Sequence, residues 1–224
     1  MVSCFILDYM HLACLGVMKR LLSFWNGSYR KRHAQLSSCA IRLLSTKINE
    51  VKLYVPKEFN RKLRPMAELS YWKAAEFRMF LLYVGVAILK DKAIMSKQTY
   101  KHFIKFSISM RILVSPCPTD SDIDVSRKLL KEFCMDCPKY YQDGFMSYNV
   151  HSLIHLPDDC YLFGSLELIN CFPFESYLGI LKQCVHSGYK PFEQVGTHAY
   201  NQNENIVISM KKEVLSLPPG CDFK

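Results

Sequence analysis

The chain has 224 residues, of which 50% are hydrophobic and 22% are charged. This balance excludes an intrinsically disordered chain, and the length allows one sizeable core or one core with a helical excursion. Lysines and arginines outnumber aspartates and glutamates by 29 to 20, so the formal charge of +9 favours polyanionic partners, although a merely solvated basic surface explains it equally well.

The ten cysteines are scattered, and the opening segment lacks a signal-peptide pattern because Asp8 and His11 interrupt its apolar run. We therefore expect reduced thiols in an intracellular compartment. Arg78 and Lys90 bracket the longest apolar candidate, which is shorter than the roughly 18 residues that a membrane helix needs. We expect no membrane span.

Helical periodicity dominates the first half of the sequence. After one expected strand at residues 2–7, apolar residues recur at helical spacing over 8–25 and again over 41–48. The prolines and cations of residues 54–65 predict a basic loop, in which Arg61 and Lys62 are candidate phosphate contacts. Residues 67–89 then give the strongest helical pattern.

Further helices are predicted over 96–114, with Ser96 as the N-cap, and over 120–141. The segment around His151 follows, and a break at 163–165 separates it from a helix that begins at about Pro173. Because alternation of period two is nearly absent, the chain is predicted to be mainly α-helical.

A carboxylate and an imidazole lie three residues apart at the start of the first expected helix. Residues at this spacing share one helix face, so Asp8 and His11 are candidates for a catalytic pair. The alternative is that Asp8 caps the helix beside a half-buried His11.

His151 and His155 are four residues apart, so on a helix both imidazoles can reach one metal ion. A structural zinc ion takes four ligands, and the pair therefore amounts to half a site. Glu175 follows twenty positions after His155 and is a candidate catalytic carboxylate.

The order of these motifs resembles the catalytic half of eukaryotic cut-and-paste transposases of the CACTA (En/Spm) kind, a likeness that includes the recombinase that assembles antigen-receptor genes. The likeness extends to about Val195, and the segments that carry it are Asp8–Val17, Tyr148–Leu156 and Phe172–Lys182, with support from Pro56–Arg61 and Trp72–Arg78.

The resemblance implies an RNase H-like core with a helical insertion before the last catalytic acid. We therefore expect a mainly α-helical chain with at most one short N-terminal strand. The expected segments are a core remnant at residues 1–25, the insertion at 26–145, a C-terminal core segment at 146–195 and a divergent tail at 196–224.

In such transposases two aspartates and one glutamate hold two divalent ions that drive phosphodiester transfer. The resemblance makes Glu175 the third acid and places His11 near the scissile phosphate. Asp8 accompanies the metal-binding acids without being one of them. His151 and His155 are implied to be two of four zinc ligands.

The resemblance places the two metal-binding aspartates, and a Cys-x-x-Cys that completes the zinc site, upstream of Asp8. We expect this chain to lack both pairs. One carboxylate cannot hold two hard cations in the required geometry, so we expect no activity from the chain alone. Zinc is expected only as a half site, and magnesium or manganese only if further acids complete the centre.

Cys134 and Cys137 offer a local alternative for the zinc site. Thirteen residues separate Cys137 from His151, which is close to zinc-finger spacing. The stretch 126–141 nevertheless reads as a helix, and two buried thiols are the competing interpretation.

Two further residues are candidates for DNA contacts. Trp72 is a candidate for stacking on a flipped base, as an aromatic of the insertion does in related hairpin-forming transposases, although its helical spacing favours core packing. Lys182, on the helix after Glu175, is a candidate contact to the DNA backbone, with ordinary solvation as its alternative.

We therefore expect a transposase-derived, DNA-associating protein that recognises transposon ends in the nucleus, with homo-oligomerisation left open. The alternatives are part of an active metal-dependent transposase or nuclease completed by upstream sequence, and a domesticated protein-interaction module. The nuclear location rests on the resemblance, because Arg30–Arg32 is only a weak import signal.

Overall fold

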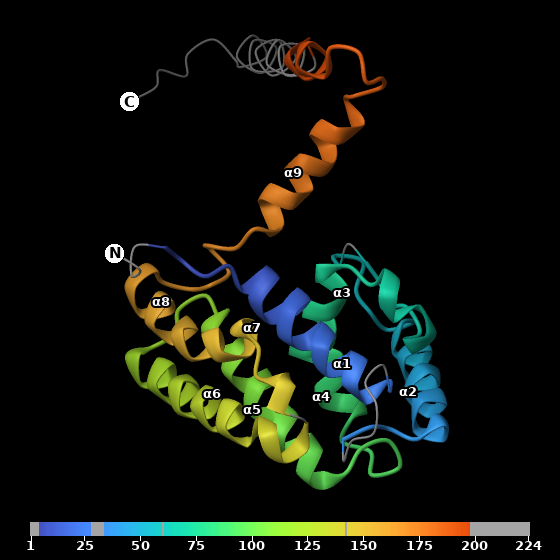
Figure 1. Cartoon of the computed structure of the whole chain (residues 1–224), viewed down its shortest axis with the longest axis vertical. Helices are drawn as coiled ribbons and strands as arrows, with labels where there is room; N and C mark the ends of the chain where they lie inside the picture. Colours follow the sequence, from blue (N-terminus) through green and yellow to red (C-terminus); the bar gives the residue numbers. More distant parts are fainter. Residues whose placement is uncertain (1–4, 28–33, 60, 142, 198–224) are drawn as a thin grey trace, which may run out of the picture. The chain divides into compact units, whose positions relative to one another are not determined.

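The computed structural model describes residues 5–27, 34–59, 61–141 and 143–197, and the chain divides into two units, Met1–Cys171 and Phe172–Lys224 (Figure 1). These residues form helices and contain no strand, so the prediction of a mainly α-helical chain is confirmed. Within the expected strand, residues 5–7 have no regular structure and residues 2–4 lie outside the described residues, as do 28–33 and 198–224.

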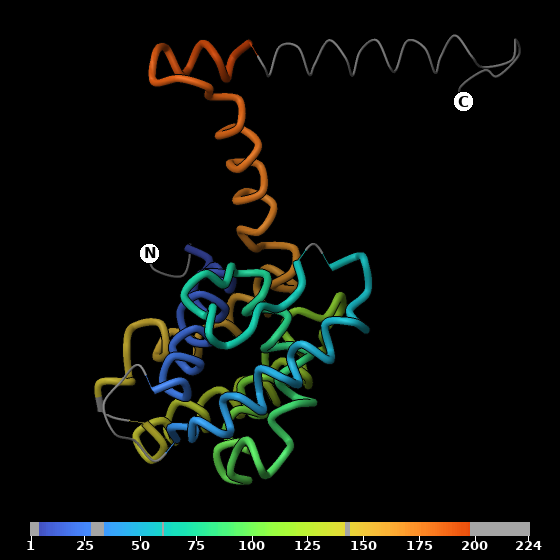
Figure 2. Tube along the Cα trace, turned by 90° about the vertical axis from the view of Figure 1, so that its right-hand side faces the viewer, coloured from blue at the N-terminus to red at the C-terminus, as the bar shows by residue number. Residues whose placement is uncertain are grey.

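The first helical segment forms the centre of the first unit. It consists of η2 (Met10–Met18), a π-helical stretch, followed directly by α1 (Lys19–Trp25). Most of its side chains are buried, as expected for a helix that is apolar on most sides. The segment contacts α3 and α7 (Figures 1 and 2). The Asn149 side chain of α7 lies against Gly16, where a Cβ would be 2.6 Å from its nitrogen.

The next helix, α2 (Ser38–Val51), is amphipathic. The Ser37 hydroxyl accepts a hydrogen bond from the amide of Ala40 at 3.1 Å and so caps the helix. Ala40, Leu44 and Ile48 form its buried face at intervals of four residues. This helix contains the apolar pattern predicted for residues 41–48.

Residues 67–89 do not form the single helix that their pattern predicts. The chain instead forms η3 (Met66–Tyr71), α3 (Ala74–Met79), η4 (Phe80–Val84) and α4 (Gly85–Ile88). Trp72 and Lys73 are extended, and the Glu76 carboxylate accepts a hydrogen bond from the Lys73 amide at 2.8 Å, which starts a new helix. Burial of Trp72 and this capping interaction override the continuous periodicity.

Helices α5 (Lys97–Leu113) and α6 (Asp120–Tyr140) lie side by side and confirm the helices predicted for these stretches (Figure 1). The Ser96 hydroxyl accepts a hydrogen bond from the Thr99 amide at 3.2 Å. Thr119 and Asp122 form a reciprocal capping box at the start of α6. Phe106 and Phe133 stack between the two helices with ring centroids 5.1 Å apart.

The last part of the first unit returns to the start of the chain. It comprises α7 (Tyr148–Ser152), η6 (Leu153–His155) and α8 (Leu156–Phe163), which ends at Gly164 with a φ of 86°. Glycine tolerates this left-handed conformation. Leu166 then donates a backbone hydrogen bond to Leu113 at 2.9 Å, and the chain continues to Cys171.

The second unit begins with α9 (Phe172–Gln183), which has no buried residue, and residues 191–197 are also helical. Among the helices of the described residues, none is both long and apolar enough to cross a membrane. The first unit contains the expected segments 1–25 and 26–145 together with the first part of 146–195.

Candidate functional site

The start of the first helical segment positions the carboxylate of Asp8. The backbone carbonyl of Asp8 accepts a hydrogen bond from the Leu12 amide at 2.9 Å, which opens the helix. The carboxylate accepts hydrogen bonds from the amides of Met10 at 3.3 Å and His11 at 3.0 Å. Asp8 therefore satisfies amide groups that have no partner within the helix, which is the work of a capping residue.

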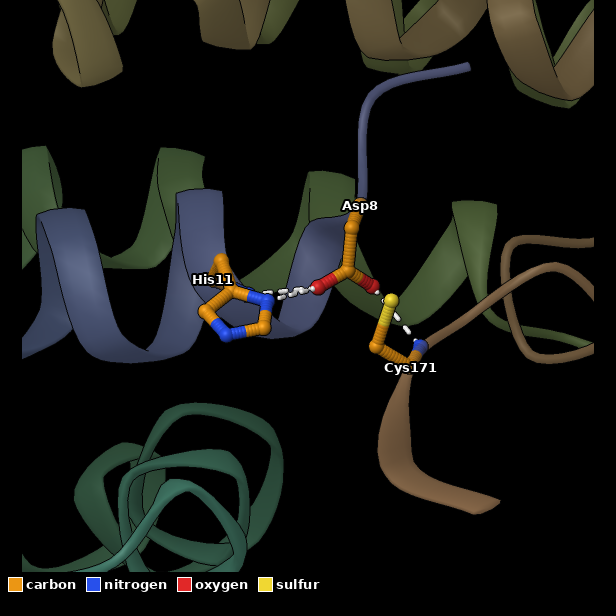
Figure 3. Close-up of side chains that lie close together, drawn as sticks. All are labelled: Asp8, His11 and Cys171. Atoms are coloured by element: carbon orange, nitrogen blue, oxygen red, sulfur yellow. Dashed lines mark hydrogen bonds and ion pairs between the residues drawn. The ribbon is translucent and has the colours of Figure 1, made fainter. Parts of the chain in front are cut away.

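Asp8 and His11 contact each other directly, as their spacing predicts. The imidazole Nδ1 of His11 lies 2.5 Å from Oδ2 of Asp8 (Figure 3). The His11 side chain is 52% exposed, whereas that of Asp8 is only 17% exposed. The pair thus combines a carboxylate held by the fold with an imidazole open to solvent.

Cys171 joins this pair from the far end of the first unit. Its amide donates a hydrogen bond to Oδ1 of Asp8 at 2.9 Å (Figure 3). One donor atom from each of Asp8, His11 and Cys171 lies within 4.8 Å of the other two, and this is the one such group of metal-binding residue types in the described chain. We call these three residues the Asp8 cluster.

The Asp8 carboxylate is anionic at neutral pH. Partial burial by itself raises the pKa of Asp8, but hydrogen bonds from the amides of His11, Cys171 and Met10, together with the His11 side chain, outweigh it and hold the pKa below its ordinary value. The charge therefore persists at the pH where a metal ion or a cationic group would bind.

A second polar network lies beside this helix start, on Tyr9, Arg78 and Glu167. Arg78 donates from Nε to the Tyr9 hydroxyl and from Nη2 to Glu167, each at 2.8 Å, and the Tyr9 hydroxyl donates to Glu167 at 3.0 Å. Burial raises the pKa of Tyr9 despite the nearby Arg78, so Tyr9 stays protonated. The network ties η2, α3 and the segment after α8 together. Sequence spacing gives no indication of it.

His151 and His155 share a face, as predicted, with ring centroids 5.7 Å apart. Both are exposed and line a pocket of about 490 Å³ together with Phe5, Leu7, Tyr148, Ser152, Asp158, Asp159 and Leu162. Asp158 pairs with Arg127, and Asp159 accepts a hydrogen bond from the Leu7 amide at 3.0 Å. Burial raises the pKa of Asp159. No third metal-binding side chain in the described chain completes a group of three with these two histidines.

Cys134 and Cys137 are buried in the core, as the competing interpretation of this pair predicted. Cys134 donates from Sγ to the carbonyl of Val150 at 3.2 Å, and Cys137 to that of Phe133 at 3.3 Å. Burial raises the pKa of Cys134 to about 12 and raises that of Cys137 as well. These protonated thiols do not gather with His151 and His155 into a zinc-finger site.

Trp72 is buried, with 4% of its surface exposed. Its ring packs against Phe77 and Phe80, with centroid separations of 5.5 and 6.0 Å, and its Nε1 donates to the carbonyl of Pro65 at 3.4 Å. Core packing is therefore what the structure supports. Stacking on a flipped base would require this side chain to leave its contacts.

Arg61 and Lys62 are exposed in the segment between α2 and η3. Glu175 and Lys182 are exposed on α9, in the second unit. The sequence patterns did not predict a role for Cys171. The one feature that could have drawn attention to it is its place directly before the Phe-Pro-Phe-Glu motif.

No protein-family model matches the chain, and no curated protein or solved structure is detectably similar to it. Function is therefore inferred from the residues, their motifs and their geometry.

Proposed function

We propose that this protein is a transposase-derived, DNA-associating protein that binds the phosphate backbone through residues 52–65, here called the basic segment. The observation that carries the proposal is a group of exposed cations without acidic partners in this segment. Because duplex DNA is a dense line of negative charge, such cations supply sequence-independent affinity.

Four of the five cations in the basic segment are exposed and make no ion pair with any described residue: Lys52, Lys57, Arg61 and Lys62. Glu58 is the one acid in the same stretch. Lys105, by contrast, pairs with Glu132 at 3.0 Å and with Asp136 at 2.9 Å. The cations of the basic segment therefore keep their charge available for a polyanion.

The basic segment is attached to the core at defined points. Leu63 is 1% exposed, and the ring of Phe59 packs edge-on against Tyr83 at 5.7 Å. Arg64 donates a hydrogen bond to the carbonyl of Tyr71 at 2.7 Å. Tyr54, at 82% exposed, presents an aromatic face beside the cations, a combination that suits nucleic acid because bases stack on aromatic rings.

The transposase origin is supported by the motifs and by a hydrogen bond between one motif and a residue that adjoins another. The hydrogen bond from the Cys171 amide to Asp8 joins the Asp-x-x-His motif to the residue directly before the segment that contains Glu175, across 163 positions of sequence. We propose Glu175 as the third acid of a centre that this chain alone does not complete, and His151 with His155 as half of a structural zinc site.

The test is equilibrium binding of a fluorescently labelled DNA duplex at several salt concentrations. We expect affinity to fall steeply with salt and the double variant Arg61→Ala/Lys62→Ala to reduce the slope of log affinity against log salt by about 2, since each phosphate contact contributes roughly 0.9. The matched control is Lys128→Ala/Lys131→Ala on α6, which removes the same charge from exposed positions.

Equal losses of DNA affinity in the two double variants would contradict a role for the basic segment. The net positive charge of the protein would then explain the binding. Absence of salt-dependent binding would favour the protein-interaction module. Cleavage of DNA by the chain alone with magnesium or manganese, abolished by Glu175→Gln, would contradict the proposed inactivity and favour the nuclease.

A further inference from the structure

We propose that Asp8, His11 and Cys171 bind one transition-metal ion of the zinc class. The site is distinct from the histidine pair His151 and His155 and from any magnesium or manganese centre at Glu175. It goes beyond DNA association, which requires no metal at this position.

The donor atoms lie close enough together that a small movement of the side chains would allow all three to bind one ion. Tetrahedral zinc with bonds of roughly 2.0 to 2.3 Å places its ligand atoms about 3.3 to 3.7 Å from one another. The donor atoms of the cluster lie within 4.8 Å, and the Nδ1–Oδ2 contact between His11 and Asp8 is 2.5 Å. His11 is half exposed, so its ring can rotate outward to admit the ion between nitrogen and carboxylate.

The carboxylate is oriented before any metal arrives. Amides of Met10, His11 and Cys171 donate to its two oxygens, so its position is held by the backbone. Such outer-shell hydrogen bonds fix ligands in protein metal sites. The hydrogen bond from the Cys171 amide also places the Cys171 thiol beside the Asp8 carboxylate (Figure 3).

The donor set selects the class of metal. A thiolate and an imidazole favour zinc, cobalt or copper(I) over magnesium and calcium, which prefer oxygen ligands alone. On binding, the Cys171 thiol releases its proton to solvent, and its sulfur and the metal form the new bond. Three protein ligands leave a fourth position of a tetrahedral ion for water or a phosphate oxygen.

The experiment is titration of the full chain with cobalt(II) and then zinc, followed by visible and near-ultraviolet absorption and by calorimetry. We expect a thiolate-to-cobalt charge-transfer band that zinc displaces. Cys171→Ser should abolish the band, and His11→Ala should lower affinity by more than the roughly 10- to 100-fold cost of losing an outer-shell partner. Far-ultraviolet circular dichroism verifies that each variant is folded.

Two controls separate this site from others. Cys117→Ser changes an exposed cysteine outside the cluster, and His151→Ala/His155→Ala removes the histidine pair; both should retain the band. A cobalt complex without a thiolate band, a band that survives Cys171→Ser, or loss of the band in the histidine double variant would each overturn the proposal. DNA binding is measured separately at low metal concentration. Because it requires no metal at this site, its outcome tests the proposed function independently of the metal proposal.

Discussion

Two regions of the first unit combine cysteine with histidine, and they differ in access to water. On α6, the Sγ of Cys137 lies 3.9 Å from Nε2 of His102 on α5, and Cys134 is buried on the same helix as Cys137. His102 is 1% exposed and stacks on Phe133 at a centroid distance of 4.3 Å. At the start of η2, Cys171 lies beside a carboxylate and the half-exposed His11. The first region has the spacing of a metal motif but the environment of a core. The second has the Asp-x-x-His spacing but no cysteine within it, and its histidine is open to solvent.

Burial explains the difference in chemistry. Desolvation lowers the pKa of His102 to about 4 and raises that of Cys134 to about 12, so both groups are neutral at pH 7. Asp8 stays charged because backbone amides compensate its partial burial. The residue types in a sequence indicate which side chains could bind a metal ion. Exposure to solvent and hydrogen bonding then determine whether such a side chain can reach its ligand protonation state.

The largest expected difference between the regions is in thiol reactivity. Raising the pKa of Cys134 from 9.0 to about 12 lowers its thiolate fraction roughly 1000-fold at neutral pH, and burial further restricts access. Alkylation of the native chain, followed by mass spectrometry, should modify exposed Cys39 and Cys117 first and leave Cys134 and Cys137 until unfolding. Zinc should slow the modification of Cys171 alone. Equal alkylation rates at all cysteines would contradict the difference in access between the two regions.

The second effect is a pH dependence of stability from His102. Its folded pKa of about 4 lies below the ordinary 6.5, so between these values the unfolded chain binds the proton more readily. The contribution is fully present above pH 6.5 and is lost as the pH falls toward 4, by about 3 kcal/mol in the free energy of unfolding.

Urea unfolding between pH 7 and pH 4 measures this loss. His102→Gln should flatten the pH dependence, whereas His151→Gln, at an exposed position, should leave it as in the wild type. Identical pH dependence in wild type and His102→Gln would show that His102 is accessible to protons in the folded chain.

The smallest of the three effects is the structural role of Asp8. Asp8→Ala removes the acceptor for three amides and should lower the free energy of unfolding by about 1 to 2 kcal/mol, as expected for a lost cap. Because the folded pKa is depressed, this stabilisation is present above the ordinary value of 3.8 and is lost as the pH falls through the folded pKa.

Asp8→Asn is the matched control for this change. Its amide oxygen still accepts hydrogen bonds, so we expect it to retain most of the stability while losing the metal ligand charge. Thermal unfolding at pH 7 with and without zinc compares the variants. A wild-type stability in Asp8→Ala would contradict the capping role.

Local signals predicted much of the fold. Ser96 marked the start of α5, and apolar spacing predicted α2, α5 and α6 close to their observed bounds. The break at Trp72 was not predictable, because it depends on a ring that packs into a core assembled from distant helices. Periodicity reports which face is apolar and not where tertiary packing interrupts the helix.

The candidate site, like the fold, was predictable in its local contacts and not in its contacts between distant parts of the sequence. The contact between Asp8 and His11 follows from their spacing on one helix face. Cys171 is 163 positions from Asp8, and only the return of the chain after α8 brings it there. The finger-like spacing of Cys134 and Cys137 left a ligand pair and two buried thiols as alternatives, and the structure shows buried thiols that lie apart from His151 and His155.

X-ray absorption at the zinc edge of the zinc-loaded chain tests most directly which region holds metal. The Asp8 cluster predicts one sulfur at about 2.3 Å together with nitrogen and oxygen ligands at about 2.0 to 2.2 Å, and loss of the sulfur in Cys171→Ser. Two sulfur ligands that persist in Cys171→Ser and disappear in Cys134→Ser would place the metal at the other region and contradict the distinction drawn between them.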